Sequence, residues 1–263
     1  MRRRRLLASA VAGAALVAGM LAAPARAAGP SAAQSDNWFG YGQNVLATGN
    51  FVRQVSATWH VPTVHQRVAG QAENSAVWTG VGGGCLGSNC SIGATDETLI
   101  QAGTEQDVNA DGSTSYMAWW EAVPAPEVAF ANLAIHPGDG VRTTVAQTGP
   151  EIWTVTVDDV TDGQSGSATV TVPYASDYST AEWIVETPLL LGANAGFAAL
   201  PAMSTVQIQN ALVDGQPALL RYPAQAIDLI DANGNVVAAP SPPTGARGDR
   251  FDACAQPVCA APH

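Results

Sequence analysis

Three segments of the sequence place a glutamine or a glutamate among large apolar residues at the spacing of a β-strand. Side chains alternate between the two faces of a strand, so each of these polar residues shares a face with apolar ones. The polar residues are Gln101, Glu121, Glu182 and Glu186. A carboxyl group in apolar surroundings has a raised pKa, and acid–base catalysis needs such a group. The pattern therefore indicates candidate catalytic residues.

The same pattern also has a purely structural interpretation. The polar residues can simply form the solvated face of an antiparallel sheet, and the pattern alone favours this. The Asp111-Gly112 dipeptide is typical of a tight turn and lies between the first two segments. It predicts a hairpin in which Gln101 and Glu121 come close across the sheet.

The elements that carry these residues read as short strands separated by turns. Asp162-Gly163 and Asn233-Gly234 are two further turn signals, and no stretch has helical periodicity over more than a turn or two. The fold class predicted is all-β, an antiparallel two-sheet β-sandwich of the concanavalin or lectin-like kind. The predicted strands are 54–61, 75–81, 98–103, 115–123, 152–157, 168–172, 181–186, 206–208 and 226–230.

Composition and charge narrow the possible partners. The chain has 263 residues and no lysine, and from Ala28 onward six arginines face 22 acidic residues. Nucleic acids and anionic lipid surfaces bind clusters of Lys and Arg, so neither is expected as a partner. A monomer without a cofactor or a metal ion is expected.

The first 27 residues predict a signal peptide. Arg2–Arg5 form a positive region, Leu6–Ala23 form an apolar one, and Ala25-Arg26-Ala27 gives the small residues of a cleavage site. Secretion is therefore expected, with no membrane association after cleavage.

The four cysteines form two C-x4-C pairs, Cys85/Cys90 and Cys254/Cys259. Two short-loop disulfides are the simplest interpretation for an exported protein. A zinc site built from all four thiolates is the alternative.

The sequence contains no G-x-S-x-G, H-E-x-x-H, P-loop, Asp-Thr-Gly or Asp-Ser-Gly motif, so none of these local motifs announces a catalytic site.

Six motifs in order resemble those of the glutamic peptidases, the eqolisin family of secreted acid endopeptidases. They cover roughly residues 37 to 190 and are the segments 37–41, 55–62, 76–81, 99–103, 116–121 and 181–186, the last reading A-E-W-I-V-E. The family fold is a β-sandwich of two antiparallel sheets. Together with the signal peptide (1–27), the resemblance divides the chain into a lead-in (28–36), the peptidase domain (37–255) and a tail (256–263). Polypeptides are the implied substrates.

The resemblance also implies the roles of particular residues. The family's catalytic glutamine falls on Gln101 and its catalytic glutamate on Glu186. Trp119, Glu121 and Trp78 match positions that line the substrate cleft. Glu186 would take a proton from water and return it to the leaving amine, while Gln101 would orient the water and donate to the oxyanion. Glu182 is the rival base, but it lies about 13 Å from Glu186 along the strand, and we interpret it as structural.

The sequence departs from the family at two places. An acidic residue of the fungal members is replaced by Gly82 here, and only about ten residues separate the predicted cleavage site from Trp38. A sandwich glycoside hydrolase that uses Glu121 and Glu186 is one alternative, because paired carboxylates cleave glycosides. A non-catalytic lectin-like binding module is the other.

Overall fold

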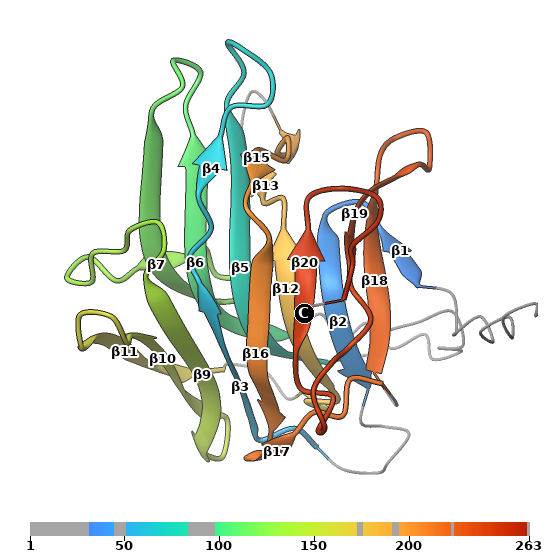
Figure 1. The fold of residues 1–263 in the computed structure, drawn as a ribbon. Coiled ribbons are helices and arrows are strands. Elements are labelled where there is room, and N and C mark those ends of the chain that lie inside the picture. Colours follow the sequence, from blue (N-terminus) through green and yellow to red (C-terminus); the bar gives the residue numbers. More distant parts are fainter. Residues whose placement is uncertain are drawn as a thin grey trace, which may run out of the picture.

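Every regular element in the described part of the chain is a β-strand. The structure is a computed structural model that describes residues 32–44, 51–83, 98–172, 176–190, 195–221 and 224–261 (Figure 1). The strands are rich in Val, Thr and Trp, residues that favour sheets. Ile152–Asp159 alternates buried and more exposed side chains, whereas Glu73–Gly82 and Thr180–Glu186 are buried on both faces.

One sheet carries all the segments with candidate catalytic residues. Its strand order is β1-β18-β2-β12-β5-β6-β7-β8. Neighbours are antiparallel, except that β1 runs parallel to β18. The bounds are β1 Ala33–Ser35, β18 Ala224–Ile230, β2 Trp38–Asn44, β12 Thr180–Glu186, β5 Glu73–Gly82, β6 Leu99–Val108, β7 Thr114–Ala122 and β8 Val128–Ala129.

The second sheet has the order β11-β10-β9-β3-β16, and β17 pairs with β16. Through β20 and β19 its hydrogen bonding continues from β16 to β18 of the first sheet. The bounds are β11 Gln164–Thr171, β10 Ile152–Asp159, β9 Gly140–Gly149, β3 Gln54–His60, β16 Val206–Val213, β17 Gln216–Pro217, β20 Phe251–Cys254 and β19 Val236–Pro240. Two small pairs lie outside both sheets: β13 (Leu189–Leu190) with β14 (Gly196–Phe197), and β4 (Val64–His65) with β15 (Ala202–Met203).

The two sheets pack face to face around one hydrophobic core. In Figure 1, β9, β3 and β16 cross in front of β7, β6, β5 and β12, and β3 and β9 both contact β5. Val77, Ile100 and Trp183 of the first sheet are buried there with Val145 and Val155 of the second. The predicted β-sandwich is confirmed.

The predicted strands are all present, and several are longer than predicted. The segment predicted for 98–103 continues to Val108 in β6, and that predicted for 206–208 continues to Val213 in β16. The three turn dipeptides lie between β6 and β7, β10 and β11, and β18 and β19, as expected. Their glycines have φ between 70° and 83°, a conformation that side chains disfavour. Strands β2, β9 and β19 were not among those predicted.

Cys254 and Cys259 form a disulfide, as predicted. This excludes a zinc site built from four thiolates. The predicted Cys85–Cys90 bond and the predicted signal peptide lie outside the described residues. Within those residues, no helix is long and apolar enough to cross a membrane.

Candidate active site

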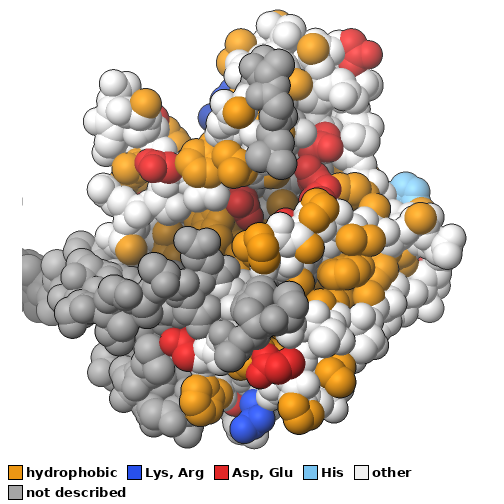
Figure 2. All heavy atoms as spheres, turned by 180° about the vertical axis from the view of Figure 1, so that it is seen from behind, with side chains coloured by type: hydrophobic (Ala, Val, Ile, Leu, Met, Phe, Trp, Pro, Cys, Tyr) orange, Lys and Arg blue, Asp and Glu red, His pale blue; other side chains and the backbone are white. Residues whose placement is uncertain are grey.

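The candidate residues lie on the face of the first sheet that points away from the main core. Alternation sends Val77, Ile100 and Trp183 into the core, so the residues beside them point the other way. A second, smaller apolar cluster covers this outer face, formed by Ala76, Trp78, Trp119, Ile184 and Ile227. Figure 2, the view from behind Figure 1, shows acidic and hydrophobic side chains gathered in a hollowed part of the surface.

Register places the site in three rows across four neighbouring strands. One row joins Glu182, Gly80, Gln101 and Glu121. The next row joins Ile184, Trp78, Gly103 and Trp119, and the third joins Glu186, Ala76, Glu105 and Met117. Gln101 and Glu186 therefore lie diagonally on either side of the row that contains Trp78 and Trp119.

Gln101 and Glu121 form the expected cross-strand pair. Gln101 Nε2 donates to Glu121 Oε2 at 2.6 Å. Gln101 Oε1 is buried and accepts no hydrogen bond among the described residues. Burial raises the pKa of Glu121, and the hydrogen bond from Gln101 opposes that rise. The amide of Gln101 thus has one N–H fixed, and it keeps one N–H and its carbonyl oxygen for other partners.

Glu186 is the last residue of β12 and is held by donors from two strand regions. Trp78 Nε1 donates to Glu186 Oε2 at 2.7 Å, and Asn37 Nδ2 donates to Oε1 at 2.9 Å. Trp38 packs edge-on against Trp78, with ring centroids 5.1 Å apart. The motif that opens with Asn37 resembles the family's first motif, but no role was predicted for Asn37 itself.

Opposing effects set the acidity of Glu186. Their balance raises its pKa to about 7: burial is the largest cause, and the charge of Glu121 also raises it. The hydrogen bonds that Trp78 and Asn37 donate lower it, because donors favour the carboxylate. The donors therefore keep the carboxylate accessible at a lower pH than burial alone would allow.

Glu182 lies deeper than Glu186. It is 2% exposed, its Oε2 has no hydrogen-bond partner among the described residues, and burial raises its pKa to about 8. A Cβ at Gly82 would lie 2.9 Å from Glu182 Oε1 and 2.5 Å from Thr180 Oγ1. The carboxyl group of Glu182 and the hydroxyl of Thr180 thus take up the space that a side chain at position 82 would need.

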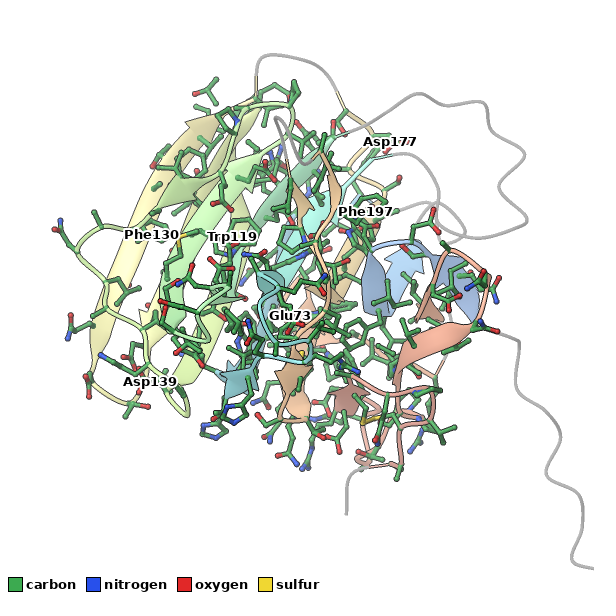
Figure 3. All side chains as sticks on the ribbon, turned by 90° about the horizontal axis from the view of Figure 1, so that it is seen from above. Glu73, Trp119, Phe130, Asp139, Asp177 and Phe197 are labelled. Atoms are coloured by element: carbon green, nitrogen blue, oxygen red, sulfur yellow. A yellow bond between two sulfur atoms is a disulfide. The ribbon has the colours of Figure 1, made fainter. Side chains whose placement is uncertain are left out.

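The two predicted cleft tryptophans are both buried. Trp78 is fully covered and Trp119 is 3% exposed, and the indole Nε1 of Trp119 has no partner in the described part of the chain. Figure 3 labels Trp119 on β7. Gly80 allows Trp78 to lie flat over β5, because a Cβ there would be 2.9 Å from the Trp78 ring. The indole N–H of Trp78 donates to Glu186, and its ring packs against Trp38.

A further group of carboxyls extends along β6 from the site. The pKa of Glu105 is raised to about 9; burial is the largest cause, and the nearby charges of Asp107 and Glu127 also contribute. Among the described residues, no three His, Cys, Asp or Glu side chains are arranged as metal ligands would be.

The interpretation of this face as a solvated sheet surface is wrong. Gln101 is 4% exposed, Glu182 2% and Glu105 9%. Tryptophans and apolar side chains cover the polar groups, and the alternation pattern cannot reveal that cover because it records only which face a residue is on.

A family model described as the Peptidase A4 family matches residues 36–244. The chain belongs to this family. It is 32% identical over 168 residues to Aspergillopepsin-2 of Aspergillus niger, a match that covers 58% of this chain and 56% of that protein. The chain thus spans about half the length of this curated relative.

Three solved structures share the fold. Scytalido-glutamic peptidase with a transition state analog inhibitor has a TM-score of 0.65 and 23% identity, over 84% of this chain and 98% of that one. SCP-B, a member of the Eqolisin family in complex with the tripeptide Ala-Ile-His, has a TM-score of 0.60 and 22% identity over the same shares. Aspergilloglutamic peptidase from Aspergillus niger has a TM-score of 0.52 and 25% identity, over 70% and 99%.

Proposed function

We propose that this protein is a secreted endopeptidase that hydrolyses peptide bonds in polypeptides in acid, with Glu186 as general base and Gln101 as the group that orients water and stabilises the oxyanion. The observation that supports it most is the pair itself: an amide fixed by Glu121 and a carboxylate fixed by Trp78 and Asn37 lie on one face of the sheet. Family membership favours this function over the glycoside hydrolase and the lectin-like module.

The proposed roles of Gln101 follow from the hydrogen-bonding groups of its amide that have no partner among the described residues. Gln101 Oε1 accepts no hydrogen bond from the described residues, so it can accept one from a water molecule. The second N–H of its Nε2 can donate to the oxygen that becomes negative as the water attacks the carbonyl carbon. An oxyanion donor of this kind contributes roughly 3–4 kcal/mol to transition-state stabilisation. Because the amide does not titrate, it keeps both roles at every pH.

Glu186 supplies the proton transfer. As a carboxylate it takes a proton from the attacking water, and as a carboxylic acid it gives that proton to the amine that leaves. Because the pKa of Glu186 is raised to about 7, the carboxylate is the minor form in acid, and its share grows as the pH approaches 7. Glu186 is favoured over Glu182 because Glu182 is fully covered, whereas Glu186 is partly accessible. Trp78 is proposed to position Glu186, and Trp119 and Glu121 to line the substrate cleft.

Acid conditions suit the rest of the site. Glu182 and Glu105 are buried without a described cation beside them, and their pKa values are raised to about 8 and about 9. Both are therefore neutral in acid.

We also propose export through a cleaved segment 1–27, a peptidase domain over 37–255 and a monomeric state. The Cys254–Cys259 disulfide supports export, because such bonds persist in oxidising surroundings.

Digestion of an unfolded protein tests the function. The purified protein is incubated with reduced, alkylated substrate from pH 2 to 8, and the product masses identify the cleaved bonds. Internal cleavage in acid that resists pepstatin-type, serine-directed, thiol-directed and chelating inhibitors is expected. Complete inhibition by a chelator, or the absence of peptide products at every pH, would contradict the proposal.

A further inference from the structure

The strand that precedes the family match ends beside the site. β1 pairs in parallel with β18, with Ser35 opposite Leu229. The chain then turns through Asp36 and Asn37 and enters β2 at Trp38. Ser35 lies just outside residues 36–244, so the family match says nothing of it.

The hydroxyl group of Ser35 makes three hydrogen bonds within this turn. Its Oγ accepts from the backbone N–H of Trp38 at 3.0 Å and of Asn37 at 3.3 Å. It donates its own proton to Asn37 Oδ1 at 3.2 Å. Because a hydroxyl has two acceptor lone pairs and one proton, two accepted bonds leave only donation for the third. Its partner must therefore be the carbonyl oxygen of the Asn37 amide, and not its nitrogen.

This arrangement determines which end of the Asn37 amide faces Glu186. With Oδ1 held by Ser35, Nδ2 points to Glu186 and donates to Oε1 at 2.9 Å. If the amide were turned over, its oxygen would face the carboxylate instead. That orientation would disfavour the ionised form of Glu186 and favour the protonated form.

We propose that Ser35 is a positioning residue of the active site, which locks the Asn37 amide in the orientation that donates to Glu186. The inference rests on the proposed function for its catalytic meaning. The N-terminal strand thereby takes part in the site, because pairing with β18 places Ser35 at the turn.

Other groups also act on Glu186, and a change at Ser35 leaves them in place. The described titratable groups near this face are Glu121 from β7, Glu105 and Asp107 from β6, Glu182 from β12 itself, and Glu127 after β7, which interacts with Glu121 and Glu105. β5 and β2 contribute the indoles of Trp78 and Trp38, β18 contributes Ile227, and the turn carries the exposed Asp36. A difference in the pKa of Glu186 between the wild type and a Ser35 variant therefore comes from the lost hydrogen bond that orients the Asn37 amide.

The test compares Ser35→Ala with wild type in the full chain. The acidic limb of the kcat/KM profile should move to higher pH by about half a unit to one unit, so that turnover below the limb falls roughly three- to tenfold. KM and the plateau of kcat/KM above the acidic limb should change little. Ser35→Thr, which keeps the hydroxyl, should have the wild-type acidic limb. Ser113→Ala is the matched control, because the Ser113 hydroxyl bonds Asp111 at 2.6 Å in an exposed turn. Its profile should match the wild type.

Two results would overturn the inference. One is a Ser35→Ala profile that superimposes on the wild type. The other is an equal loss at every pH that follows a lowered unfolding temperature, because that would show only a structural role.

Direct titration of the Glu186 carboxyl by carbon-13 NMR separates this inference from the proposed function. The pKa of Glu186 should be higher in Ser35→Ala than in wild type, and an unchanged pKa would overturn the inference. If the wild type cleaved no peptide, the proposed function would fail, while the titration would still decide what Ser35 does.

Discussion

Replacing Glu182 with glutamine should make the protein more stable at neutral pH. Glu182 is 2% exposed, and burial raises its pKa from 4.5 to about 8. Glutamine has nearly the same shape, retains a group to bond Thr180 and does not titrate. The variant therefore removes one ionisation and little else.

The sign and the size of the effect follow from proton linkage. Below pH 4.5 Glu182 holds its proton in both the folded and the unfolded state, so its contribution to stability is complete. As the pH rises from 4.5 towards 8, the unfolded chain releases the proton while the folded protein keeps it. The free energy of unfolding then falls by about 1.4 kcal/mol per pH unit from this group. By pH 7 the free energy of unfolding has fallen by about 3 kcal/mol, and Glu182→Gln does not lose this stability because glutamine does not ionise.

Urea unfolding of both proteins at pH 4, 5, 6 and 7 measures this difference. The two free energies of unfolding should agree near pH 4 and separate by about 3 kcal/mol at pH 7, with the variant more stable. Every other carboxyl titrates in both proteins, so its effect cancels. Parallel pH dependences would refute the reasoning, because they would mean that Glu182 ionises equally easily in the folded state. The variant should also keep measurable peptidase turnover.

Three further predictions concern the neighbours of Glu186 and the cysteines. Trp78→Phe removes the donor at 2.7 Å and should raise the pKa of Glu186 by roughly one to two units, seen as an acidic limb shifted to higher pH; an unmoved limb would contradict this. Gly80→Ala places a Cβ 2.9 Å from the Trp78 ring and should cost about 1–3 kcal/mol in urea unfolding and lower turnover, whereas wild-type stability would refute the close contact. Peptide mapping should find Cys85 joined to Cys90, and a free thiol at either position would disprove that pairing.

Much of the fold could be predicted because alternation and turn residues are local signals. The Asp111-Gly112 turn fixed the register of β6 against β7, and with it the contact between Gln101 and Glu121. β2 was missed because Gly40 and Gly42 interrupt its apolar pattern. Those glycines pair with Ile184 and Glu182, which a single sequence does not reveal.

The support of Glu186 could not be predicted, because it depends on contacts between distant segments. Asn37 and Glu186 are 149 residues apart, and Trp78 and Glu186 are 108 apart. Asn37 opens the first of the six segments that resemble the family, 37–41, and this was the one sequence signal that pointed to it. Ser35 precedes that motif, so only the structure connects it to the site.

The turnover of Glu186→Gln beside that of Glu121→Gln tests the central claim most directly. Both variants exchange a carboxylate for an amide of the same shape on the same face, and each should be checked for wild-type unfolding in urea at pH 4, where the raised pKa of the replaced carboxyl has little effect on stability. With Glu186 as the base, Glu186→Gln should lose activity by about a hundredfold or more, as expected for the loss of general acid–base catalysis. Glu121→Gln, which can still bond Gln101, should retain measurable activity. Wild-type turnover by Glu186→Gln together with an inactive Glu121→Gln would contradict the assignment.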